Sequence, residues 1–174
     1  MDREASTVFD SVRRIAAAAA PAALLALMPA PAQADATRPA VAAGPTTVQV
    51  LMDDVIARTN AVRVRAGCGP LTVDQELMIV SVRQSHYMAA TGDFGHTGWR
   101  GSTFRSRSRA VGYDHVAAEN IAWGYSSSDE VVAAWMASPE HRRNILNCKA
   151  RSFGAGVQRA TNGTLYWTQV FGWR

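Results

Sequence analysis

A carboxylate inside an apolar run constrains this 174-residue chain more than any other feature. Glu119 and Asn120 interrupt residues 117–125, which otherwise suit a strand that crosses a core. Because a buried carboxylate without partners costs several kcal/mol, Glu119 predicts partners elsewhere in the chain. His96, in a glycine-rich loop, and His141 are the two candidates. Both lie too far from Glu119 in sequence for one helix face, so such a cluster requires tertiary folding.

The segments around this run alternate between helical and extended patterns. Periodic apolar residues predict a helix over 48–65. Thr72 and Gln75 predict a capping box at the start of a second helix. Asn162-Gly163 predicts a hairpin between two terminal strands. The pattern is that of a single α+β domain. Three arginines of the first helix are expected to face outward: Arg58, Arg63 and Arg65.

Residues 1–34 are typical of a secretory signal peptide. Their apolar stretch, 15–28, follows two arginines, contains Pro21 and is too short to span a membrane. We expect cleavage near Ala34, a secreted mature chain that meets the membrane only during export, and a disordered Ala/Pro/Thr-rich spacer over 35–47. An uncleaved anchor and a translation start further downstream are the alternatives.

The two cysteines, Cys68 and Cys148, both lie in loop-like contexts of the mature region. Export to an oxidising compartment favours a disulfide between them, and two buried free thiols are the alternative. Closing so long a loop would stabilise the fold by roughly 4 kcal/mol.

The net charge of +4 comes almost entirely from arginine, because Lys149 is the only lysine among 18 basic residues. An anionic partner such as nucleic acid, lipid headgroups or a cell-wall polymer is one interpretation. Along the sequence only Arg105, Arg107 and Arg109 cluster. We therefore favour charges scattered over a solvated surface and expect no specific nucleic-acid partner.

Several collinear segments resemble the CAP superfamily, also called the SCP or cysteine-rich secretory, antigen 5 and pathogenesis-related group, in its bacterial form. The resemblance runs from about residue 50 to the C-terminus and implies a CAP/SCP domain over 48–174. It also implies a three-layer α-β-α sandwich with a central antiparallel sheet. The matching segments are the helix with Asn60 and Arg63, the loop at His96, Gly112-Tyr113, residues 118–124, residues 131–136, residues 138–146 and residues 166–172.

The resemblance places His96, Glu119 and His141 together in a cleft, with Asn120, Ser138 and Asn144 around them. Eukaryotic members of the family carry a second glutamate where this chain has Ser138. Two neutral imidazoles and one carboxylate suit a weakly bound divalent metal such as zinc. Without a metal, Glu119 could orient a histidine as a general base, or only lock the 90–98 loop onto the fold.

Three functional classes follow from these observations. The first is a secreted, monomeric binding module whose cleft and exposed aromatics, Trp99 or Trp123, contact a lipid, a cell-wall component or a host protein. The second is an extracellular metal-assisted or histidine-based hydrolase, and the third is a structural domain for protein partners. We favour binding over enzymatic turnover because no hydroxyl in the sequence is marked as an activated nucleophile, and because the resemblance is to a fold associated with lipid binding and signalling.

Overall fold

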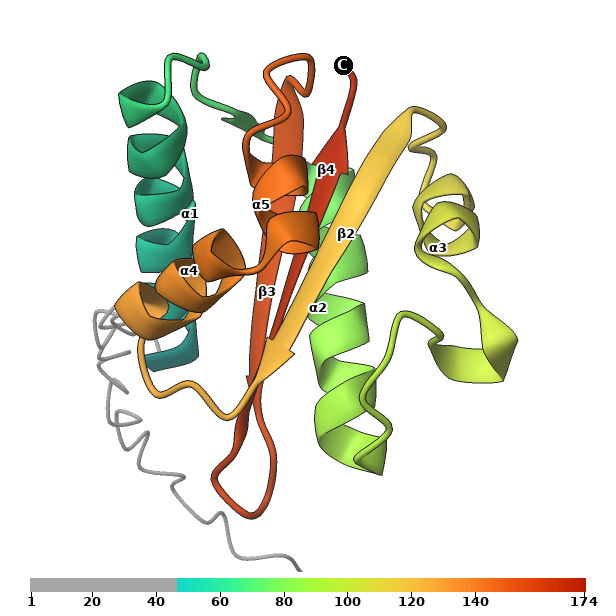
Figure 1. Cartoon of the computed structure of the whole chain (residues 1–174). Helices are drawn as coiled ribbons and strands as arrows, with labels where there is room; N and C mark the ends of the chain where they lie inside the picture. Colours follow the sequence, from blue (N-terminus) through green and yellow to red (C-terminus); the bar gives the residue numbers. More distant parts are fainter. Residues whose placement is uncertain (1–46) are drawn as a thin grey trace, which may run out of the picture. The chain divides into compact units, whose positions relative to one another are not determined.

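The computed structural model describes residues 47–174, in which helices cover both faces of one sheet (Figure 1). The predicted signal peptide and the spacer up to residue 46 lie outside the described residues, whereas Thr47 already belongs to the first helix. Within 47–174, no helix is long and apolar enough to cross a membrane.

Helices α1, α4 and α5 cover one face of the sheet, and α2 and α3 cover the other (Figure 1). This arrangement confirms the predicted α-β-α sandwich. The helices are α1 Thr47–Arg65, α2 Gln75–Thr91, α3 Phe104–Ala110, α4 Ser128–Ala137 and α5 Pro139–Ile145, with a 3₁₀ turn, η1, at Trp99–Gly101.

The sheet has the strand order β1-β3-β4-β2, with β1 Thr72–Val73, β2 Val116–Trp123, β3 Ser152–Arg159 and β4 Leu165–Gly172. Its three long strands are antiparallel, and β3 and β4 form the predicted hairpin around Asn162-Gly163. The two-residue β1 pairs with β3 in parallel, so the sheet is mixed at that edge rather than wholly antiparallel. Strand β4 is buried along its whole length because both of its faces are covered.

Two glycines of β3 let α2 approach the sheet closely. A Cβ at Gly154 would lie 2.1 Å from the Leu77 carbonyl carbon, and one at Gly156 would lie 2.3 Å from that of Ser81. Serine hydroxyls of α2 use this approach, since Ser81 donates to the Gly154 carbonyl (3.0 Å) and Ser85 to the Gly156 carbonyl (2.9 Å). Glycine in a strand interior here marks close backbone contact.

The prediction for the start of α2 was wrong. Asp74 is the N-cap and accepts a hydrogen bond from the Leu77 amide at 3.1 Å. Thr72 instead pairs with Ser152 as part of β1. Asp74 provides the acceptor that an N-cap requires, so the helix begins two residues later than a Thr72 cap would set it.

The predicted outward orientation of Arg63 was also wrong, because this side chain is buried with 1% of its surface exposed. It lies on the α1 stripe that also buries Val55 and Thr59. Burial lowers the pKa of Arg63, and the charge of Arg151 lowers it further. The guanidinium donates to four backbone carbonyls, those of Gly69 (3.0 Å), Ile145 (2.6 Å), Asn147 (3.0 Å) and Ala150 (3.2 Å).

The predicted disulfide joins Cys68 to Cys148 across a sequence separation of 80 residues. Each cysteine neighbours a carbonyl that Arg63 contacts, at Gly69 and Asn147. The 145–150 loop is therefore fastened to the end of α1 both covalently and by a buried cation.

Candidate functional site

Glu119 is fixed in the middle of β2, where its backbone pairs with Val170 of β4. Its side chain is fully buried, and its two oxygens contact different partners. Oε1 lies 2.9 Å from Nδ1 of His96, and Oε2 accepts from Nη2 of Arg107 at 2.5 Å. The carboxylate inside the apolar run thus has a histidine and an arginine as partners, each from a different segment.

Arg107 also holds the main chain of the histidine loop. Its Nη1 donates to the carbonyls of His96 (3.2 Å) and Ser102 (2.9 Å). Sequence reasoning placed Arg107 in a surface cluster with Arg105 and Arg109, but in the structure only Arg107 turns inward. The signal that could have found it was the buried carboxylate itself, for which an arginine is as good a partner as a histidine.

The 93–98 loop is packed against α2 as well. Nε2 of Gln84 donates to the Gly95 carbonyl at 2.8 Å. A Cβ at Gly98 would lie 2.5 Å from Oε1 of Gln84 and 3.0 Å from Nη1 of Arg107. Only glycine fits there without displacing the two side chains that hold the loop. The loop therefore presents His96, whose side chain is about half exposed, from a defined backbone position.

His141 reaches the site from α5, and Asn120 positions that helix. Nδ2 of Asn120 donates to the His141 carbonyl (3.2 Å), and Nδ2 of Asn144 donates to Oδ1 of Asn120 (2.8 Å). The imidazole of His141 has no hydrogen bond to Glu119, so of the three predicted residues the structure joins only His96 and Glu119 directly. Asn120 thus contacts α5 at the His141 carbonyl and at the Asn144 side chain, while Ser138 lies at the junction of α4 and α5.

The pKa of His141 is lowered, first by burial and then by the positive charge of His96, with Glu140 acting in the opposite direction. The imidazole of His141 is therefore neutral at neutral pH. A neutral imidazole can accept a hydrogen bond or bind a metal, which a protonated one cannot.

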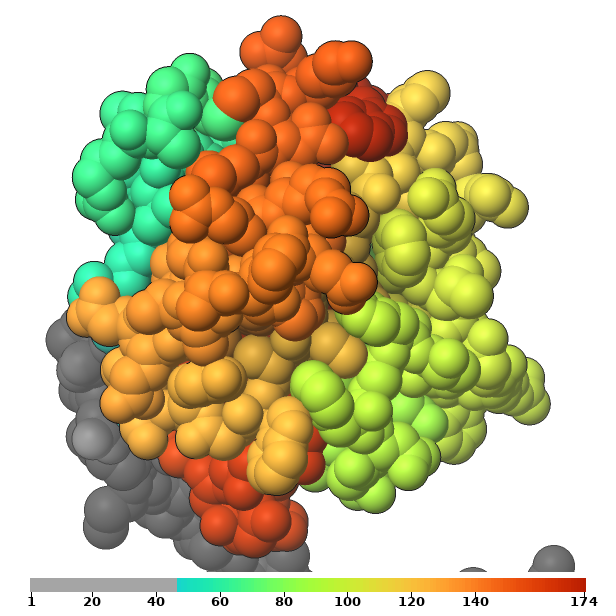
Figure 2. All heavy atoms as spheres, viewed as in Figure 1, coloured from blue at the N-terminus to red at the C-terminus, as the bar shows by residue number. Residues whose placement is uncertain are grey.

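A cleft of about 260 Å³ lies beside these residues, between the end of β2, α4 and the start of α5. Phe94, Trp123 and Tyr125 supply exposed aromatic surface around it, and Ser138 and His141 supply polar atoms. The rings of Phe94 and Trp123 lie 6.3 Å apart between centroids and are tilted to each other. Figure 2 shows the segments of this face meeting over β2, with α4 and α5 in orange and the 93–98 loop in yellow-green.

The three-ligand metal site expected from the resemblance does not fit these contacts. Both oxygens of Glu119 are taken, and residues 47–174 contain no group of three or more His, Cys, Asp or Glu side chains that could hold a metal ion. Because Nδ1 of His96 contacts Glu119, its Nε2 and the imidazole of His141 are the nitrogens left for an ion. Glu119 would then orient a ligand instead of being one.

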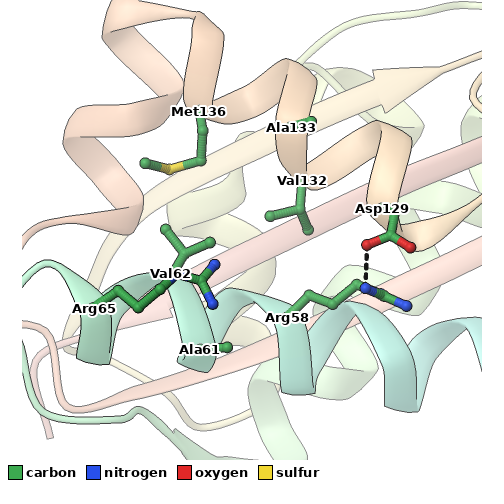
Figure 3. Close-up of a pocket in the computed structure, with 8 residues that line it drawn as sticks. All are labelled: Arg58, Ala61, Val62, Arg65, Asp129, Val132, Ala133 and Met136. Carbon is green, nitrogen blue, oxygen red and sulfur yellow. Dashed lines mark hydrogen bonds and ion pairs between the residues drawn. The ribbon is translucent and has the colours of Figure 1, made fainter.

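A second hollow, of about 290 Å³, separates α1 from α4 (Figure 3). Its apolar lining comes from Ala61 and Val62 of α1 and from Val132, Ala133 and Met136 of α4. An ion pair between Arg58 and Asp129 joins the two helices at one end, and Arg65 lies nearer the other (Figure 3).

Comparisons with known proteins agree with this architecture. The family model described as "CAP: Cysteine-rich secretory protein family" matches residues 56–171. "Uncharacterized protein YkwD" of Bacillus subtilis is 37% identical over 144 residues, covering 82% of this chain and 54% of the relative. "Uncharacterized membrane protein YlbC" of the same organism is 30% identical over 118 residues, covering 67% of this chain and 33% of the relative. The chain thus spans about half or less of these curated relatives.

Two solved structures extend the comparison. An extracellular protein containing a SCP domain from Bacillus anthracis has a TM-score of 0.67 at 27% identity, covering 76% of this chain and 45% of that one. An outer surface protein of Borrelia burgdorferi has a TM-score of 0.65 at 18% identity, covering 74% of this chain and 96% of that one. At 18% identity the Borrelia likeness concerns the fold alone.

Proposed function

This chain belongs to the CAP family of cysteine-rich secretory proteins, and we propose that it is an extracellular binding module whose aromatic cleft holds a saccharide component of a cell wall. An extracellular location is supported by the disulfide, since such bonds persist in oxidising compartments, and by the extracellular Bacillus anthracis relative. The expected monomer is part of this proposal.

The observation that carries the proposal is the exposed aromatic surface around a cleft with few polar groups. Trp123 keeps 55% of its surface exposed although it ends a buried strand, and Phe94 keeps 47%. A sugar ring offers a face of C–H groups that packs on aromatic rings, and hydroxyls that bond to groups such as Ser138 and His141. The volume of about 260 Å³ suits a single ring of a longer chain.

The contacts of Glu119 suggest that Glu119 and Arg107 hold the 93–98 loop in place. Arg107 and Glu119 together fix both the backbone and the imidazole of His96, and so fix the loop that carries Phe94. Hydrolysis is the alternative, because a histidine whose Nδ1 contacts a carboxylate presents Nε2 as a general base. Against it, the cleft lining includes the hydroxyls of Tyr125 and Ser138 together with His141, but His96 is not among the lining residues.

The test measures binding of N-acetylglucosamine oligomers to the mature protein, with tryptophan fluorescence as the readout. Trp123→Ala should weaken binding at least tenfold. Trp173→Ala is the matched control, because Trp173 is similarly exposed at 43% but lies outside the cleft. Equal affinity of the two variants, or no binding by wild type, would contradict the proposal. Mass spectrometry of the same samples would detect shortened oligomers if the chain is a hydrolase.

We also propose that His96 and His141 bind zinc weakly and exchangeably. Two imidazoles without a third protein ligand give a weak site, and affinity should fall in acid because protons compete with the metal for the ligand nitrogens. In calorimetric titration, His141→Ala should abolish binding and Glu119→Gln should weaken it by reducing the orientation of His96. Zinc binding that is unchanged in both variants would overturn the site.

A lipid is the second candidate ligand, favoured by the hollow between α1 and α4. Its apolar lining would surround an acyl chain, and Arg65 would meet an anionic headgroup. Val132→Trp should fill this hollow and abolish binding of a fluorescent fatty acid while leaving saccharide binding intact. Retained fatty-acid binding would exclude this hollow as the lipid site.

A further inference from the structure

We propose a second binding surface, separate from the aromatic cleft, for a flexible chain of phosphodiester groups. It is an open hollow of about 670 Å³ formed by α5 and the disulfide loop, here called the basic hollow. The residues that define it are Arg142, Arg143, Lys149, Leu146, Pro139 and Cys148.

The charge of this segment is strongly one-sided. Residues 139–151 carry Arg142, Arg143, Lys149 and Arg151 against a single acid, Glu140, which does not line the hollow. In the described part of the chain, Arg58 and Arg107 have carboxylate partners, but none of these four cations forms an ion pair. Arg142 and Arg143 complement the C-terminal end of α5, but that effect ends with the helix and does not explain Lys149 or Arg151.

The backbone beneath the basic hollow strengthens its positive character. The carbonyls of Ile145, Asn147 and Ala150 turn inward to Arg63, so these partial negative charges face the core and not the hollow. The disulfide at Cys148 fixes the same loop. A cationic surface on a rigid loop binds with less loss of entropy than cations on a mobile segment.

The lining chemistry selects among anionic partners. No aromatic side chain is found among the described residues that line the hollow, so it offers no stacking platform for the bases of a single-stranded nucleic acid. The described lining of this open hollow contains Leu146 but no Trp or Phe, the aromatic side chains with which interfacial surfaces enter a bilayer. A flexible polyol-phosphate chain can lie along this open hollow and place successive phosphates beside the three cations.

The experiment measures binding of inorganic polyphosphate and of a poly(glycerol phosphate) chain to the full mature protein at low and moderate salt. The triple variant Arg142→Gln/Arg143→Gln/Lys149→Gln removes the cations of the hollow. Arg100→Gln/Arg105→Gln/Arg109→Gln is the matched control, because it removes the same charge from exposed side chains near α3. Wild type and control should bind both polymers, and the hollow variant should lose at least tenfold in affinity.

The salt dependence gives a second readout. Each phosphate neutralised contributes about 0.7 to the slope of log K against log salt for single-stranded polyanions, so the slope should fall by about 2 in the hollow variant. Equal losses in both variants would reduce the effect to net charge and overturn the proposal. Tighter binding to phosphatidylglycerol vesicles than to either polymer, lost in the hollow variant, would overturn it in favour of a membrane. The hollow variant should bind N-acetylglucosamine oligomers as wild type does. This control separates loss of the basic hollow from loss of saccharide binding in the aromatic cleft.

Discussion

Two loops of this molecule are each held by an inward-pointing arginine, but in different ways. The 145–150 loop is tied to α1 by Arg63, fully buried among carbonyl oxygens, and by a disulfide. The 93–98 loop is tied to β2 by Arg107 through a carboxylate and two carbonyls, with no covalent link. The first loop belongs to the permanent framework. The second, which carries His96 and Phe94, is held only by contacts that can open, as the proposed role of a ligand-binding rim requires.

The largest effect on stability is expected at Arg63, which holds the 145–150 loop. Arg63→Met keeps the apolar stem but leaves four carbonyls without their donor, and we expect a loss of about 4 kcal/mol in the free energy of unfolding, measured in urea. Arg65→Met is the control, because Arg65 is exposed two residues further along α1, and it should change stability by no more than about 0.5 kcal/mol. Similar losses in the two variants would show that the carbonyl contacts contribute little.

Removing the disulfide should have the next largest effect. Cys68→Ala/Cys148→Ala should cost about 3 kcal/mol, because the unfolded chain regains the freedom of a long loop. The expected cost lies below the roughly 4 kcal/mol of ideal loop closure, since residual structure in the unfolded chain reduces the freedom that it regains. In wild type, alkylation of the denatured, unreduced chain should modify no thiol, and modification of both cysteines would rule out the bond.

Arg107→Gln tests the loop that is held without a covalent link, residues 93–98. We expect a stability loss of about 2 kcal/mol, because Glu119 keeps His96 as a partner but loses its cation. Amide hydrogen exchange should rise in the 93–98 loop and stay unchanged in the 145–150 loop. Arg105→Gln, on the same helix but exposed, should alter neither. Faster exchange in both loops would mean that the two are not held independently.

The smallest effect concerns pH. Because burial and the charge of His96 lower the pKa of His141 in the folded state, the unfolded chain binds a proton more readily below its ordinary pKa of about 6.5. Stability should therefore be full above that value and decrease as the pH falls from about 6.5 towards the folded pKa. His141→Gln should flatten this part of the stability profile, measured by urea unfolding between pH 7 and pH 5. An unchanged profile would exclude His141 as its source.

Local signals allowed much of the fold to be predicted. Asn162-Gly163 marked the hairpin, and apolar periodicity marked the helix that became α1, because turn chemistry and helical spacing depend on near neighbours. The orientation of Arg63 could not be predicted in this way. Three of its acceptors lie 82 to 87 residues away, and an arginine in an amphipathic helix ordinarily faces solvent.

In the candidate site, too, local signals predicted some residues and missed others. The expectation that a carboxylate in an apolar run needs partners led to Glu119 and His96, which lie in contact. Arg107 was missed because exposed arginines lie two residues away on each side, in the same alternation with serine, and nothing local distinguishes it from them. The family resemblance gave the three-layer arrangement, which periodicity alone did not.

The buried amides of Asn120 and Gln169 have a consequence for strand pairing. They lie opposite each other on β2 and β4 and are hydrogen-bonded, and Gln169 also donates to Thr59 of α1 at 2.7 Å. A slip of two residues between these strands would keep every side chain on its proper face, so hydrophobic burial opposes it only weakly. The slip would, however, leave both amides buried in the core without their hydrogen-bond partners, which costs about 1 to 3 kcal/mol for each unpaired group. This polar pair therefore helps to set the register of β2 and β4. It disfavours shifted pairings that an all-apolar core would tolerate.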